Sequence, residues 1–112
     1  MRKLLFIFLV FIGISASAQK SDKESYIKKE SIGGNLDFEK KVEAQYSEMT
    51  SIPFGDMTFS KKDFALLLWA VSVRNLGIDS FDQTVKLWQE IYKRNLTDTE
   101  KKALKTGFNA KF

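Results

Sequence analysis

Apolar residues recur every three or four positions along four stretches of the chain, a spacing that predicts amphipathic helices. These stretches cover residues 36–49, 61–75, 81–94 and 98–106. The second differs from the others because residues 64–71 are apolar at eight successive positions, so this helix is hydrophobic around most of its circumference. Such a helix is expected at the centre of a bundle. The pattern therefore predicts an all-α, four-helix domain over residues 35–112.

Residues typical of helix ends support these boundaries. The last three stretches each begin with the spacing of a capping box, Ser60 with Asp63, Ser80 with Gln83 and Thr97 with Glu100. Asn35 is the expected N-cap of the first stretch, and Gly77 and Gly107 are expected to end the second and fourth.

Charged residues at i and i+4 also favour helices, each pair by a few tenths of a kcal/mol. The pairs are Asp37 with Lys41, Asp82 with Lys86, Glu90 with Arg94, and Asp98 with Lys102. Between the first two stretches, residues 50–59 are rich in large apolar side chains. We expect this connector to contain a short extended piece and to fold back over the core.

Residues 1–18 have the three parts of a secretory signal peptide: a basic start, an apolar core over 4–14 and a small-residue end. The alternative is an uncleaved membrane anchor, but the apolar run is shorter than the ~20 residues that span a bilayer. We therefore expect an exported protein, either periplasmic or secreted. The expected cleavage-site residues are Ala16, Ala18 and Gln19.

The next segment, residues 19–34, is mostly charged or small and ends in two glycines. Only three of its side chains, Tyr26, Ile27 and Ile32, are large and apolar. A segment that can bury so little apolar surface is expected to be a flexible N-terminal segment or a frayed helix.

Composition narrows the possible chemistry. The 112 residues are 44% apolar and 29% charged, with no histidine and no cysteine. These two absences exclude cysteine nucleophiles, disulfides, histidine-based acid–base catalysis and the common zinc sites. We predict no catalytic residue, no metal site and no cofactor. Glu39 and Glu43, one helical turn apart, leave a carboxylate-dependent hydrolase as a remaining alternative.

A fragment resembling half of a calcium-binding loop occurs at residues 56–63, but the positions that should supply the first ligands are apolar. Calcium takes six to eight oxygen ligands, so this loop is expected to be only the approach to a capped helix.

Aromatic and basic residues mark the candidate interaction surfaces. The second helix has more apolar surface than short neighbours would cover, so Trp69, Trp88 and Tyr92 are candidates for docking a protein partner or a second copy. The sequence thus predicts a non-catalytic protein–protein interaction module.

The alternative function is binding to an anionic membrane or glycan surface, with nucleic acid a less suitable partner. The formal net charge is +4, and it falls to +2 without residues 1–18. The candidate anion-binding residues lie near the C-terminus and are Lys101, Lys102, Lys105 and Lys111.

Overall fold

The computed structural model describes the backbone of residues 16–110 and the side chains of residues 22–110. In this part of the chain five helices and one hairpin follow one another: α2 (Ala16–Glu30), α3 (Phe38–Gln45), β1 (Ile52–Phe54), β2 (Met57–Phe59), α4 (Lys61–Asn75), α5 (Phe81–Tyr92) and α6 (Asp98–Asn109). The predicted helical class is confirmed. Most of the expected leader, residues 1–15, lies outside the described residues, as does Lys111.

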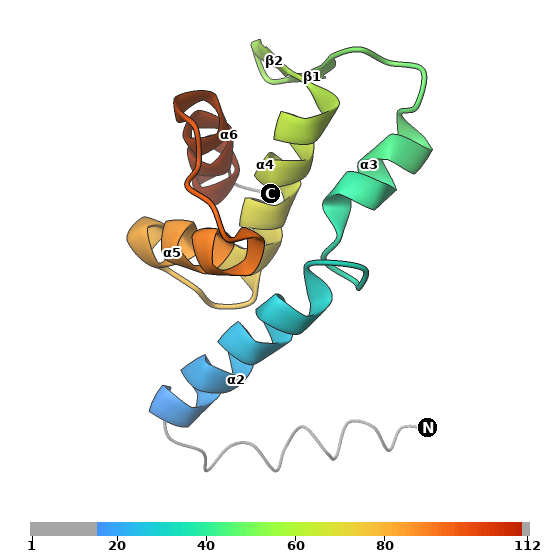
Figure 1. The fold of residues 1–112 in the computed structure, drawn as a ribbon. Coiled ribbons are helices and arrows are strands. Elements are labelled where there is room, and N and C mark those ends of the chain that lie inside the picture. Colours follow the sequence, from blue (N-terminus) through green and yellow to red (C-terminus); the bar gives the residue numbers. More distant parts are fainter. Residues whose placement is uncertain (1–15, 111–112) are drawn as a thin grey trace, which may run out of the picture.

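Helix α4 is at the centre of the fold, as its apolar circumference predicts. Helices α3 and α6 lie on opposite sides of it, and α5 lies beside its C-terminal half (Figure 1). Its sides are therefore covered by different neighbours, which explains why apolar residues occur all round it. The buried side chains of α4 are Phe64, Ala65, Leu66, Leu67, Trp69, Ala70 and Val73.

Helix α6 packs against α4 at very close range. Gly107 is buried, and a Cβ atom there would overlap the backbone carbonyl oxygen of Leu67. The prediction that Gly107 ends this helix is therefore wrong, since α6 continues through it to Asn109. Glycine is needed here because two helix backbones approach each other, and not because the chain turns.

The capping predictions are confirmed at three helices. The hydroxyls of Ser60, Ser80 and Thr97 each accept a hydrogen bond from the backbone N–H three residues on. Only the last forms a reciprocal capping box, because there the Glu100 carboxylate also accepts from the Thr97 N–H.

Helices α4 and α5 end in different ways. After α4, Gly77 adopts φ 113°, and the N–H groups of Gly77 and Ile78 donate to the carbonyls of Arg74 and Val73. This Schellman arrangement confirms the predicted stop. Helix α5 ends two residues earlier than predicted because Lys93 takes the left-handed conformation, with φ 58°.

Helix α3 is shorter than predicted at both ends. Its N-cap is Asp37 and not Asn35, and the Asp37 carboxylate accepts hydrogen bonds from the N–H groups of Lys40 and Gly33. The same carboxylate thereby holds the turn that joins α2 to α3.

Residues 19–34, expected to be either flexible or a frayed helix, are helical as far as Glu30. Residues 16–30 form α2, and Ile27 and Ser31 are fully buried. The helix is held by polar contacts to α5, where the Gln83 amide donates to Glu24 and Lys28 pairs with Glu90 at 3.2 Å. Among the α2 side chains that the structure describes, Ile27 is the one well-buried apolar residue, so tertiary contacts order this helix.

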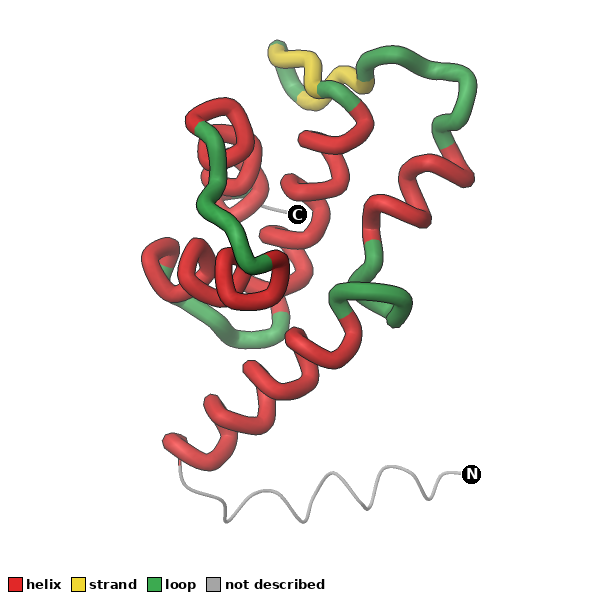
Figure 2. The backbone as a smooth tube through the Cα atoms, viewed as in Figure 1, coloured by secondary structure: helices red, strands yellow, loops and turns green. Residues whose placement is uncertain are grey.

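The connector 50–59 forms the antiparallel hairpin β1–β2, which lies at the N-terminal end of α4 (Figure 2). Gly55 has φ 65° in the two-residue turn, as the first position of a type II′ turn requires. Ile52 and Phe59 pair across the strands and are both buried. The expectation that this connector covers part of the core is confirmed.

Candidate partner-binding site

A hollow and a groove lie next to each other on the α3 side of α4. The hollow, called here the aromatic hollow, has buried walls from Trp69 of α4 and Trp88 of α5. Its rim carries the charged side chains Glu39, Lys62 and Arg94. It encloses about 20 Å³, room for one water-sized group.

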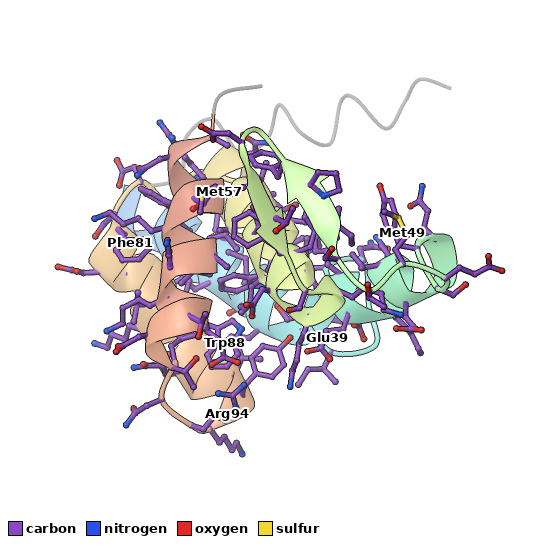
Figure 3. All side chains as sticks on the ribbon, turned by 90° about the horizontal axis from the view of Figure 1, so that it is seen from above. Glu39, Met49, Met57, Phe81, Trp88 and Arg94 are labelled. Atoms are coloured by element: carbon purple, nitrogen blue, oxygen red, sulfur yellow. The ribbon has the colours of Figure 1, made fainter. Side chains whose placement is uncertain are left out.

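One wall of the hollow is a stack of three side chains. The rings of Trp88 and Tyr92 stack with centroids 4.7 Å apart, and the Arg94 guanidinium lies 4.7 Å from the centroid of the Trp88 ring. Arg94 can reach this position because the left-handed Lys93 turns the chain back at the end of α5. In Figure 3 Glu39, Trp88 and Arg94 gather at the same edge of the molecule.

Glu100 of α6 fixes Arg94 in this stack. Its two carboxylate oxygens accept hydrogen bonds from Nη1 and Nη2 of Arg94, both at 2.8 Å. Because Arg94 and Thr97 donate to this carboxylate, the pKa of Glu100 is lowered to about 2. In contrast, the pKa of Asp63 in α4 is raised, chiefly because the carboxyl group is partly buried and also because the Glu100 carboxylate is nearby.

Hydrogen bonds join both walls of the hollow to the end of α2. The Trp69 indole N–H donates to the Ser31 hydroxyl at 2.9 Å, and that hydroxyl donates to the Ile27 carbonyl. The Tyr92 hydroxyl donates to the Ser31 carbonyl at 3.3 Å. Burial, followed by the nearby carboxylates of Glu39 and Asp37, raises the pKa of Tyr92 to about 12.

The second depression, called here the charged groove, is much larger, at about 690 Å³. It runs between α3 and the first turn of α4 and shares Glu39 and Lys62 with the aromatic hollow. The acidic residues come from α3 and its N-cap, and of the three lysines one comes from α3 and two from the first turn of α4. The charged residues that line it are Asp37, Glu39, Lys40, Glu43, Lys61 and Lys62.

Most of these charges are not neutralised within the fold. Lys61 pairs with Glu43 at 3.0 Å across the groove. Glu39, Lys40 and Lys62 are exposed and form no ion pair with any side chain that the structure describes. The groove therefore offers both signs of charge to a ligand.

The structure brings the three predicted partner-binding residues together, but not as an exposed surface. Trp69 is 3% exposed and Trp88 5%, while Tyr92 is half-buried. The two tryptophans thus shape the hollow without forming a docking face. Glu39 and Glu43, considered above as catalytic acids, both line the charged groove.

The remaining predicted residues lie elsewhere. Lys101, Lys102 and Lys105 are exposed on α6. The backbone of Ala16, Ala18 and Gln19 lies in α2, and cleavage between Ala18 and Gln19 stays a prediction. Among the side chains described, no group of three or more Asp or Glu is arranged to hold a metal ion. No helix within residues 16–110 is long and apolar enough to span a membrane.

Sequence reasoning missed Lys62 and the pairing of Arg94 with Glu100. The i, i+4 rule assigned Arg94 to Glu90, but Glu90 pairs with Lys28 of α2 instead. None of the four predicted i, i+4 pairs is an ion pair in the part of the chain that is described. The capping-box spacing at Thr97 was the one available signal, since it predicts that Glu100 points back toward the helix start.

Comparisons with protein-family models, with curated proteins and with solved structures found no match to this chain.

Proposed function

We propose that this protein is an exported, non-catalytic module that binds a segment of another protein in the charged groove. The observation that carries the proposal is the groove itself, about 690 Å³ of open space between two helices with unpaired charges on its walls. Its volume lies within the range of ligand pockets, about 300–1,000 Å³. Export is supported by the leader pattern of residues 1–18.

The charges favour a partner segment of mixed charge. A basic side chain of the partner would face Glu39 of α3, and an acidic side chain would face Lys62 of α4. Complementary charges of this kind give specificity and rapid association more than raw affinity. We therefore expect a modest affinity that weakens as salt is added.

The aromatic hollow supports this role because it borders the charged groove and shares Glu39 and Lys62 with it. It is too small to admit a partner side chain, but its Trp88–Arg94–Glu100 contacts fix the position of the loop after α5. The buried tryptophans thus pack beneath the charged residues at the edge of the hollow and support them. This differs from the sequence-based expectation of direct contact through Trp69 and Trp88.

Charge exchange in the groove tests the proposal. The full-length protein, tagged at its C-terminus, would be used to capture partners from an extract of the producing cell. The variant Glu39→Lys/Lys62→Glu keeps the net charge and reverses the groove pattern. The matched control Glu48→Lys/Lys29→Glu makes the same exchange at exposed positions that do not line the groove.

We expect one or more proteins to be captured by the wild type and by the control, and to be lost with the groove variant. Capture that survives the groove exchange, or that is lost equally in the control, would place the interaction elsewhere. Circular dichroism of all three proteins confirms that each is folded.

A further inference from the structure

The outer face of α6 is a second charged surface, on the opposite side of α4 from the charged groove (Figure 1). Lys101, Lys102 and Lys105 are all exposed on this helix. Lys101 and Lys105 are one turn apart, so their Cα atoms are separated by about 6 Å along the axis. The three lysines therefore share one side of a short helix, and the Lys105 ammonium lies 6.0 Å from the centroid of the Phe81 ring of α5.

The acidic residues of α6 do not neutralise this face. Glu100 is 8% exposed, because it turns inward to cap Thr97 and to bind Arg94. Asp98 is exposed but forms no ion pair with Lys102 or with any other side chain described. Because Glu100 is paired with Arg94 and turned inward, the outer face of α6 has three lysines and a single aspartate.

The shape and polarity of this face limit the kind of partner it suits. The exposed large apolar residues of the described chain are Tyr26, Ile32 and Met49, and none of them belongs to α6. A protein interface usually has an apolar core, which this face lacks. The charged groove and the aromatic hollow both open on the α3 side, whereas the lysines stand on a convex helix.

We propose that the outer face of α6 binds the headgroup layer of an anionic phospholipid membrane through charge alone. A flat, negatively charged layer can meet all three ammonium groups at once without any groove. Each Lys near such a surface contributes roughly 1 kcal/mol at most. The binding is therefore weak, reversible and abolished by salt, and it adds membrane proximity to the partner binding proposed above.

Vesicle sedimentation with the full-length protein tests this proposal. The vesicles would contain either phosphatidylglycerol and phosphatidylcholine in equal amounts or phosphatidylcholine alone. The test variant Lys101→Gln/Lys102→Gln/Lys105→Gln removes the basic face. The control Lys29→Gln/Lys86→Gln/Lys93→Gln removes three exposed charges that line neither the groove nor the hollow, and it has the same net charge.

We expect the test variant to bind anionic vesicles at least tenfold more weakly than the wild type at low salt, and the control to lose less than threefold. The difference between the wild type and the test variant should vanish in high salt, where charges are screened. Equal losses in the two variants, no binding, or a difference that persists in high salt would overturn the proposal. Binding to soluble heparin without binding to vesicles would overturn it in favour of an anionic glycan.

Discussion

Helix α4 has two neighbours that pack against it in opposite ways. On one side α6 approaches so closely that Gly107 has no room for a Cβ atom beside the Leu67 carbonyl. On the other side α3 contacts α4 through larger side chains, including a Tyr46–Phe64 ring pair with centroids 5.9 Å apart. The charged groove lies on this same side, between α3 and the first turn of α4.

The comparison shows how one apolar helix supports both a rigid interface and an open one. Small residues permit backbone contact and exclude water, so the α4–α6 side is dominated by packing. Large and charged residues hold helices apart, so the α3–α4 side keeps polar groups in contact with solvent. We expect substitutions on the first side to change stability, and substitutions in the groove to change binding.

Replacing Gly107 with Ala should have the largest effect. The added methyl group would force α6 away from α4, and we expect a loss of about 3 kcal/mol of unfolding free energy. This loss should appear even though Ala is intrinsically the better helix former by about 1 kcal/mol. Urea unfolding followed by circular dichroism measures it.

Asn109→Ala in the same turn is the control, and its exposed side chain should give a change within about 0.5 kcal/mol. If the two variants have similar midpoints, α4 and α6 are not in backbone contact.

Replacing Glu100 with Gln should cost about 1.5–3 kcal/mol at neutral pH, because it weakens hydrogen bonds to a charged group. Since folding lowers the pKa of Glu100 from 4.5 to about 2, its contribution is complete above pH 4.5. It is lost as the pH falls toward about 2. Urea midpoints recorded between neutral and acid pH should show a smaller acid loss in the variant.

Glu48→Gln, an exposed change between α3 and β1, should keep the acid profile of the wild type. An unchanged acid profile in Glu100→Gln would contradict the assigned role of its carboxylate.

Replacing Tyr92 with Phe should cost about 1 kcal/mol, the value of one hydrogen bond, here the one to the Ser31 carbonyl. Folding raises the pKa of Tyr92 from 10 to about 12. The wild type therefore keeps this contribution below pH 10 and loses it as the pH rises toward 12. Absorbance titration of the phenolate follows the change.

The titration of Tyr92→Phe should lack the step near pH 12. The titration of Tyr26→Phe, a change at an exposed position, should retain that step. A titration in which removing Tyr92 leaves that late step in place would refute the assignment.

The smallest effects are expected in the groove. Glu39→Gln and Lys62→Gln should each change the unfolding free energy by less than about 0.5 kcal/mol, because neither side chain forms an ion pair in the described structure. Thermal unfolding monitored by circular dichroism is sufficient. A loss above about 1 kcal/mol would mean that these charges hold α3 in place and are not free for a partner.

Local signals in the sequence located the central helices well. Helix α4 has the predicted bounds, because Ser60 and Gly77 determine its ends through short-range hydrogen bonds. At Gly107 the same kind of reasoning was wrong, because a glycine that ends a helix and one that permits helix contact are identical in the sequence. Only the position of α4 distinguishes the two.

Features that depend on distant residues were not predictable. Helix α2 has few apolar residues, and its order depends on Trp69, Gln83 and Glu90, which follow it by 38 residues or more. The Arg94 contacts were missed for a different reason: Glu100 is only six residues away, but Arg94 reaches it and Trp88 because the non-glycine residue Lys93 takes a left-handed conformation. The periodicity of a single helix does not predict these contacts of Arg94.

The order of the helices in the chain affects how the protein can fold during synthesis. Helix α4 is complete at Asn75, but the helix that packs most closely on it starts only at Asp98. While the ribosome adds the intervening residues, the apolar residues 64–71 of α4 have no cover on that side. The contact between α4 and α6 can therefore form only after synthesis has passed the last residues of α6.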